Sequence, residues 1–158
     1  MLLNLPPEIQ ELIFDYLDLQ SQLRLRRVCK STTNLAVTNF WDLPSLIKPW
    51  TLTENILRGF PQIKYLNLYD NKMVTDINFL TKITVLNIGG LCTINDSGII
   101  NLRNLCELYA ENNFNIHNLE NKPNIKYLDA SGNCGITNDD IVGLHLKELY
   151  CVYNPKIN

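Results

Sequence analysis

Short alternations of apolar and polar residues recur from residue 63 to the end of the printed chain. Five nine-residue frames begin at residues 63, 83, 105, 125 and 146, so successive frames start 20 to 22 residues apart. In each frame the first, fourth and sixth positions are apolar or small, as in Ile63, Leu66 and Leu68. A period of two predicts a short β-strand with one buried face. Because one strand cannot bury that face alone, we expect the frames to stack as parallel strands of one sheet.

The residues that follow each strand are expected to close the turns. An asparagine occupies the ninth position of four frames, where its amide can pair with backbone groups buried between coils. These residues are Asn71, Asn113, Asn133 and Asn154. The second frame has Leu91 there instead, after two glycines, which predicts an irregular corner. A further apolar residue completes each turn: Met73, Ile94, Ile116, Ile136 and Ile157.

This period and pattern resemble those of the leucine-rich repeat. Segments 94–99 and 136–141 also resemble part of the cysteine-containing subtype, although Cys92 and Cys134 each lie one place after the position that the subtype uses. The resemblance implies an α/β solenoid of about five repeats, whose parallel sheet offers a concave binding surface. A chance series of unrelated strands is the alternative, and it would have to explain five copies in one frame.

A helical pattern replaces the alternation in the first forty residues. Pro6 and Pro7 suit a first helical turn, and the apolar residues that follow have i, i+3, i+4, i+7, i+8 spacing. This apolar stripe consists of Ile9, Leu12, Ile13, Tyr16 and Leu17, with Phe14 lying off it. Further helices are expected over residues 21–28 and from about residue 31 to 40. Since so short a segment rarely buries enough surface to stand alone, it should pack on the repeats and on another protein.

Residues 5–41 resemble an F-box in the order and spacing of their residues. The segment begins Leu5-Pro6-x-Glu8-Ile9, continues with Ile13-Phe14 and Leu17, and ends with Leu23-Arg24-Leu25 and Trp41. Together with the repeats it resembles the F-box and leucine-rich-repeat protein family. The resemblance implies a three-helix module that docks on a Skp-type adaptor and, through it, on a cullin–RING ubiquitin ligase. The family's adaptor-contact positions fall on Leu5, Pro6, Ile9, Ile13, Leu17, Val28 and Cys29. Gln22 and Thr32 stand where the family often has Leu and Trp.

The expected fold class is therefore an α + α/β solenoid in three segments. Residues 1–41 form the F-box-like helical module, residues 42–62 a connection with a degenerate first repeat, and residues 63–158 the repeat array. Within the connection we expect a strand near residues 41–46 and a short helix over residues 53–60, ended by Gly59 and Pro61. The alternative reading of residues 1–41 is a simple cap on the open end of the solenoid, because repeat arrays need one.

The strand residues that alternate with the buried ones should form the concave face. Six of the seven tyrosines fall at such positions, and tyrosine is enriched in binding surfaces. The candidate substrate-binding residues are Tyr65, Tyr69, Glu107, Tyr109, Glu111, Tyr127, Asp129, Glu148 and Tyr150. Their carboxylates predict a protein substrate with a basic stretch. The blander alternative is that tyrosine simply tolerates half-exposed strands.

Composition and charge narrow the function further. A net charge of −2 gives no electrostatic reason to bind nucleic acid or an anionic membrane, and no apolar run is long enough to span a bilayer. The start lacks a basic leader. Five cysteines without a Cys-x-x-Cys pair indicate free thiols in a reducing compartment, the cytoplasm or nucleus, or that of a host cell if the sequence is viral. We expect no metal, no cofactor and no enzymatic activity. The function expected is recruitment of a protein substrate to the ligase, and the alternative is a stand-alone interaction or decoy module.

Overall fold

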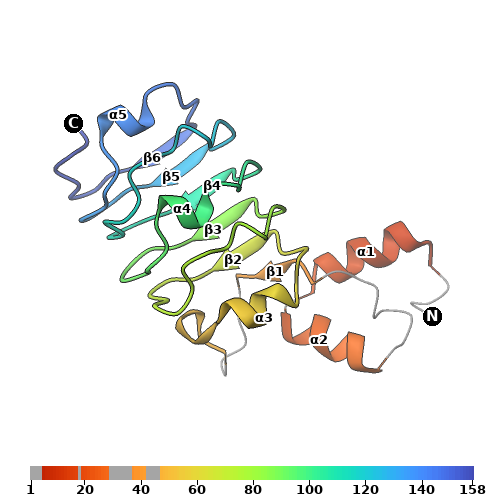
Figure 1. Cartoon of the computed structure of the whole chain (residues 1–158). Coiled ribbons are helices and arrows are strands. Elements are labelled where there is room, and N and C mark those ends of the chain that lie inside the picture. Colours follow the sequence, from red (N-terminus) through yellow and green to blue (C-terminus); the bar gives the residue numbers. More distant parts are fainter. Residues whose placement is uncertain (1–4, 18, 29–36, 42–46) are drawn as a thin grey trace.

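The computed structural model describes residues 5–17, 19–28, 37–41 and 47–158. Its described elements are α1 (Pro7–Asp15), α2 (Leu19–Val28), β1 (Asn39–Phe40), the 3-10 helix η3 (Pro49–Thr51), α3 (Glu54–Arg58), β2 (Tyr65–Asn67), β3 (Val85–Asn87), α4 (Asp96–Ile99), β4 (Glu107–Tyr109), β5 (Tyr127–Asp129), α5 (Asn138–Ile141) and β6 (Glu148–Tyr150). Figure 1 shows the strands side by side along the solenoid, with α1 and α2 beside its β1 end.

The six strands form one parallel sheet in chain order, from β1 to β6. Its central row consists of Leu66, Leu86, Leu108, Leu128 and Leu149, paired from strand to strand. The first four leucines are fully buried, whereas Leu149 on the edge strand is 36% exposed. The stacked parallel strands expected from the sequence are thereby confirmed, because each coil covers the apolar face of its neighbour.

The turn after each strand alternates between two constructions. The buried residues at this corner are Asn71, Cys92, Asn113, Cys134 and Asn154. Asn133 was expected among them, but it is exposed, and the thiol of Cys134 takes the buried place. The second and fourth frames thus carry one additional residue before the corner. The eighth residue has a positive φ in all five frames, and it is a glycine in these two: Gly90 at 69° and Gly132 at 66°.

The buried asparagines tie one coil to the previous one. The Asn113 amide donates from Nδ2 to the carbonyl of Ile88 at 2.8 Å and to that of Ile94 at 3.3 Å, while its Oδ1 accepts from the backbone N–H of Asn115. Asn71 and Asn154 make the same pattern of bonds with their own preceding coils. The predicted role of these three amides is therefore confirmed.

The apolar residue that closes the first turn is Val74, and the expectation of Met73 was wrong. Val74 is fully buried, whereas Met73 is 60% exposed. Val74 is the twelfth residue of its frame, the position that isoleucine occupies in the other four frames, whereas Met73 is the eleventh. The Asn71 side chain accepts from the backbone N–H groups of both residues. Ile94, Ile116 and Ile136 are buried as predicted, and Ile157 is partly buried.

A second period of 42 residues relates the helices on the convex side, where α3, α4 and α5 begin at residues 54, 96 and 138. The first residue of each helix accepts backbone N–H groups from the next coil. Glu54 accepts from Thr75 and Asp76, and Asp96 accepts from His117 and Asn118. Asn138 accepts from Asn158. Every second coil therefore carries a helix that caps the coil after it. The helix expected near residues 53–60 is α3, with Thr53 as its N-cap.

The N-terminal helices join the sheet through a residue outside the predicted apolar stripe. Phe14 is 1% exposed and belongs to the core that continues through the repeats, with Leu17 packed against it. Gln22 is also buried, and its Nε2 donates to the Phe14 carbonyl at 2.9 Å. Phe14 is thus the residue of α1 that joins the core, although it lies off the predicted stripe.

The prediction of a third helix from about residue 31 to 40 is wrong for its last residues. Residues 37–40 are not helical, and Asn39–Phe40 form β1, which pairs with β2. The sheet therefore begins at residue 39, before the expected strand near 41–46. Residues 29–36 and 42–46, and with them Cys29, Thr32 and the rest of these two expectations, lie outside the described residues. In the described part of the chain, no helix has the length and apolar content needed to cross a membrane.

Candidate functional site

The concave residues of β4, β5 and β6 alternate between tyrosine and carboxylate in two rows. Parallel pairing places Glu107, Tyr127 and Glu148 side by side in one row. The same pairing places Tyr109, Asp129 and Tyr150 in the next row. Every tyrosine thus has carboxylates as its cross-strand or within-strand neighbours, in the pattern of a checkerboard. We call these six residues the tyrosine–carboxylate checkerboard.

The three tyrosine rings of the checkerboard form a continuous stack. The ring centroids of Tyr109 and Tyr127 are 4.8 Å apart, and those of Tyr127 and Tyr150 are 5.3 Å apart. Such tilted contacts stabilise the rings beyond the effect of their buried area. The side chains are therefore ordered before any ligand arrives, which lowers the entropic cost of binding.

A fourth ring, which was not expected on this face from the sequence, extends the stack. Trp41 follows β1 directly, and its ring centroid lies 5.2 Å from that of Tyr109. Because β2 and β3 separate β1 from β4, the indole must reach across the concave side of both strands. Asn67 and Asn87, the short polar residues of that row, leave room for it. Only the alternation of Trp41 with the buried Phe40 could have signalled this position.

The carboxylates of the checkerboard form no ion pair among the described residues, although Lys126 and Lys147 border the same hollow as Glu107 and Glu148. The Tyr109 hydroxyl donates to Glu107 Oε2 and the Tyr150 hydroxyl to Glu148 Oε2, each at 3.4 Å, and the backbone N–H of Ser131 donates to Asp129. Within the described part of the chain, these three carboxylates have only such neutral donors as partners. Burial, followed by nearby negative groups, raises the pKa of Tyr127 to about 12. The face therefore has a negative potential that favours a cation.

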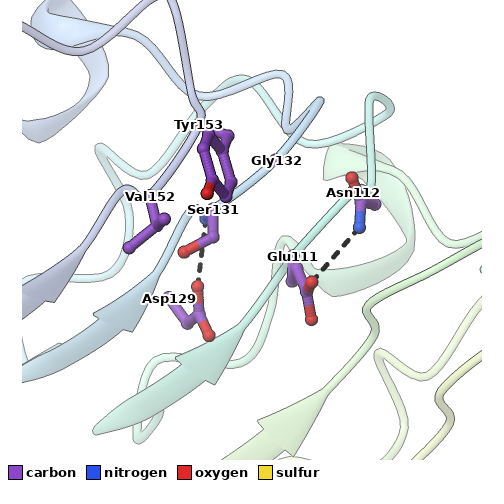
Figure 2. Close-up of a pocket in the computed structure, with 7 residues that line it drawn as sticks. All are labelled: Glu111, Asn112, Asp129, Ser131, Gly132, Val152 and Tyr153. Carbon is purple, nitrogen blue, oxygen red and sulfur yellow. Dashed lines mark hydrogen bonds between the residues drawn. The ribbon is translucent and has the colours of Figure 1, made fainter.

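A shallow hollow continues this negative surface at the carboxyl ends of β4 and β5. It has a volume of about 480 Å³, and Figure 2 shows the side chains of Glu111 and Asp129 along it, with Tyr153 at its other side. The backbone turns sharply here, since Asn112 and Tyr153 both have a φ of 58°. The Glu111 carboxylate accepts from Asn112 Nδ2 at 3.3 Å. Two of the predicted substrate-binding carboxylates thus share one hollow.

Tyr65 and Tyr69, the other two predicted substrate-binding residues, lie apart from the stack. Tyr65 on β2 is 41% exposed, and Tyr69 follows the same strand. Burial raises the pKa of the Tyr69 hydroxyl, with added effects from Asp70 and Glu111. The structure therefore brings seven of the nine predicted residues together over β4–β6 and its adjoining hollow, and leaves these two toward the β1 end.

A second candidate surface lies on α1, where apolar side chains face the solvent. Leu5, Ile9, Leu12 and Tyr16 are 37%, 42%, 56% and 85% exposed. Pro6 is exposed as well, whereas Ile13 and Leu17 are half-buried. Val28 ends α2, and Cys29 lies outside the described residues. The predicted adaptor-contact residues of α1 thus include both an exposed set and a set that packs inward.

Comparison with known protein families assigns this helical segment. Residues 2–39 match the F-box domain. A search of curated protein sequences found no match. Among solved structures, internalin C2 from Listeria monocytogenes is similar, with a TM-score of 0.42 and 19% sequence identity. That similarity covers 79% of this chain and 63% of the internalin chain.

The F-box match includes Gln22 and Thr32, the two positions where the family often has Leu and Trp. The structure describes only Gln22. Its side chain is buried between α1 and α2 rather than exposed for a partner. Oε1 of Gln22 has no hydrogen-bond partner within the described residues. The glutamine therefore acts on the packing of the F-box region, and the exposed face of α1 does not depend on its side chain for contacts.

The cysteines do not form a reactive or metal-binding cluster in the described residues. Cys92, Cys106, Cys134 and Cys151 are free. Burial raises the pKa of the Cys92 thiol to about 11, and it raises the pKa of Cys134 as well. Thiols of this kind are poor nucleophiles at neutral pH. No group of metal-ligating side chains occurs among the residues described.

Proposed function

We propose that this protein is a substrate-recognition adaptor of an SCF-type cullin–RING ubiquitin ligase. The F-box region would bind a Skp-type adaptor, and the solenoid would hold the protein to be modified. The observation that carries the proposal is the match of residues 2–39 to the F-box domain, since F-box domains generally bind such adaptors. The exposed apolar side chains of α1 support it, because contiguous apolar surface commonly marks a protein interface.

The substrate half of the proposal rests on the concave face. Tyr109, Tyr127 and Tyr150 offer rigid aromatic contact area, and carboxylates that have no ion-pair partner among the described residues lie beside them. We propose that the substrate is a protein with a basic stretch, which these carboxylates attract. Tyr65 and Tyr69 would extend the contact toward the F-box region.

In this role the protein is not itself an enzyme, because the partner ligase supplies the chemistry. We also propose that it acts in the cytoplasm or nucleus, where the ligase and reduced cysteines are both found. No cofactor is needed for recruitment of this kind.

The adaptor half is tested by co-purification with a Skp-type adaptor. Leu5→Ala combined with Pro6→Ala should abolish co-purification, because removing anchors at an interface commonly costs more than about 2 kcal/mol. Far-UV circular dichroism and the urea midpoint should stay near those of the wild type, since both residues are exposed. Tyr153→Ala, which removes an exposed side chain far from α1 along the solenoid, is the matched control and should bind normally. Absence of adaptor binding by the wild type, or full binding by the double variant, would refute the proposal.

A second function, a stand-alone interaction or decoy module, is favoured by one observation. Phe14 lies in the continuous core and β1 pairs with β2, so the helical end also covers the first coil of the solenoid. A protein of this kind would bind its target through the concave face and would not retain the adaptor in the same co-purification.

A further inference from the structure

The checkerboard contains the same tripeptide twice. Glu107-Leu108-Tyr109 forms β4, and Glu148-Leu149-Tyr150 forms β6. In both strands the tyrosine hydroxyl donates to the glutamate Oε2 at 3.4 Å. The face therefore presents two equivalent carboxylates, each held by a hydroxyl and each open on its remaining acceptor sites.

The distance between these two carboxylates follows from the sheet. β5 lies between β4 and β6. Since neighbouring strands lie about 4.8 Å apart, the two glutamates repeat at roughly 10 Å along the solenoid axis. The Tyr127 ring stands between them and is covered on both sides by the rings of Tyr109 and Tyr150. A ligand thus meets a ridge of aromatic edges flanked by two cation-binding positions.

We propose that the concave face of β4–β6 binds a polyproline-II segment that carries two basic side chains three residues apart. In this conformation residues i and i+3 lie on the same side and about 9 Å apart, which matches the repeat of the two glutamates. A fully extended strand points i and i+3 to opposite sides, and its same-side residues i and i+2 lie only about 7 Å apart. Aromatic-lined surfaces are also the usual docking sites of polyproline-II segments.

Charge complementarity sets the position of the two basic side chains. Each meets a glutamate that has no cationic partner among the described residues, and Asp129 lies between them in the adjacent row. Arginine suits the site because its planar fork of N–H donors engages a carboxylate with two bonds and packs on aromatic rings. Lys126 and Lys147 border the glutamates on the side where the strands begin. They repel a cation there and favour its approach from the tyrosine side.

This inference deepens the proposed function by naming the substrate class, and it can be tested without the adaptor. Fluorescence anisotropy at low salt would measure the binding of labelled alanine–proline peptides of equal length to the whole chain. The peptides carry two arginines at i and i+3, the same pair at i and i+1, or two citrullines at i and i+3. We expect the first peptide to bind at least tenfold more tightly than either other one, a difference of about 1.4 kcal/mol. Citrulline keeps the shape of arginine and removes its charge.

Variants of the chain locate the site. Glu107→Gln and Glu148→Gln should each weaken binding of the i, i+3 peptide by about tenfold, and together they should remove its advantage over the i, i+1 peptide. Glu120→Gln, which changes an exposed acid outside the concave face, is the matched control and should bind as the wild type does.

Equal binding of the arginine and citrulline peptides would overturn the inference, as would equal effects of Glu120→Gln and Glu107→Gln. It would also be overturned by tighter binding of a helical peptide with arginines at i and i+7, which lie roughly 10 Å apart on a helix. If the wild-type chain prefers the i, i+3 peptide but does not co-purify with the adaptor, the proposed function alone is refuted. If the wild-type chain binds the adaptor but does not prefer the i, i+3 peptide, the inference alone is refuted.

Discussion

At the scale of single residues, the corner of each coil decides how the repeats are joined. Asn71, Asn113 and Asn154 satisfy buried carbonyls of the preceding coil, whereas Cys92 and Cys134 fill the equivalent place with a small apolar thiol. Asn113 and Asn154 therefore donate to carbonyls of the two cysteine coils, and Asn71 donates to carbonyls of the coil that contains η3. The residue type at this buried corner, asparagine or cysteine, distinguishes the two kinds of coil.

Asn113→Ala should lower the free energy of unfolding by about 1–3 kcal/mol, because it leaves the carbonyls of Ile88 and Ile94 buried without their donor. Asn133→Ala is the matched control. Because Asn133 is exposed, this substitution should lower the free energy of unfolding by less than about 0.5 kcal/mol. Urea titration of both variants measures the difference. Equal losses would contradict the assignment of Asn113, and not Asn133, to the buried corner.

At the scale of elements, the helices of every second coil stabilise the coil that follows. Glu54 at the start of α3 accepts from Thr75 N–H, Thr75 Oγ1 and Asp76 N–H, each at 3.1 Å. These bonds, led by the one from the Thr75 N–H, lower the pKa of the Glu54 carboxyl, against a smaller opposing effect of burial. A helix of only five residues thus acts as a clamp between coils.

The lowered pKa of Glu54 has a defined consequence for stability. Because the folded pKa lies below the unfolded one, the contribution of the carboxylate is fully present above its ordinary pKa and is lost as the pH falls through the lowered value. Glu54→Gln should therefore destabilise the protein at pH 7, by less than about 1 kcal/mol since the group lies at the surface. The difference from the wild type should shrink in acid.

Urea titrations at neutral and acidic pH measure this effect of Glu54→Gln. Glu120→Gln serves as the control, because the Glu120 carboxylate accepts no hydrogen bond from the described residues. A difference between wild type and Glu54→Gln that is the same at both pH values would show that charge plays no part in the clamp.

At the scale of the whole molecule, burial falls from the middle of the sheet to β6. Leu108 is fully buried between β3 and β5, whereas Leu149 is 36% exposed on the edge strand. In a stacked array each coil is stabilised by its neighbours, so the edge coil contributes less to the total stability. The tyrosine–carboxylate checkerboard extends from the well-buried coils to this edge.

Leu108→Ala should therefore lower the free energy of unfolding by about 2–5 kcal/mol, because the surrounding coils can relax little around the cavity. Leu149→Ala should lower it by clearly less, since part of the side chain already faces solvent. Guanidinium titration of the two variants makes the comparison. Similar losses at both positions would mean that the last coil is covered as well as the central ones.

The sequence alone determined strands β2 to β6, their order and most of the core, whereas β1 was expected to be the end of a helix. The period-two frames and the leucine at the fourth position of each are local features, so they could be recognised without knowing which segments meet. The same holds for α3, whose N-cap Thr53 and terminating Gly59 lie within a few residues of each other. The candidate tyrosines and carboxylates followed from the same alternation, because it fixes which side of a strand each residue occupies.

Only the tertiary structure decided the features that depend on a distant partner. Cys134, and not Asn133, is buried at its corner, where Gly132 packs closely on Asn112 of the previous coil and the Asn133 N–H donates to Asn112 Oδ1. Phe14, which lies off the predicted apolar stripe, is the residue of α1 that joins the buried core of the repeats. Trp41 joins the tyrosine stack because the concave sheet brings Tyr109 to it from three strands away. Each outcome depends on contacts between residues far apart in the chain, which no local pattern of apolar and polar positions contains.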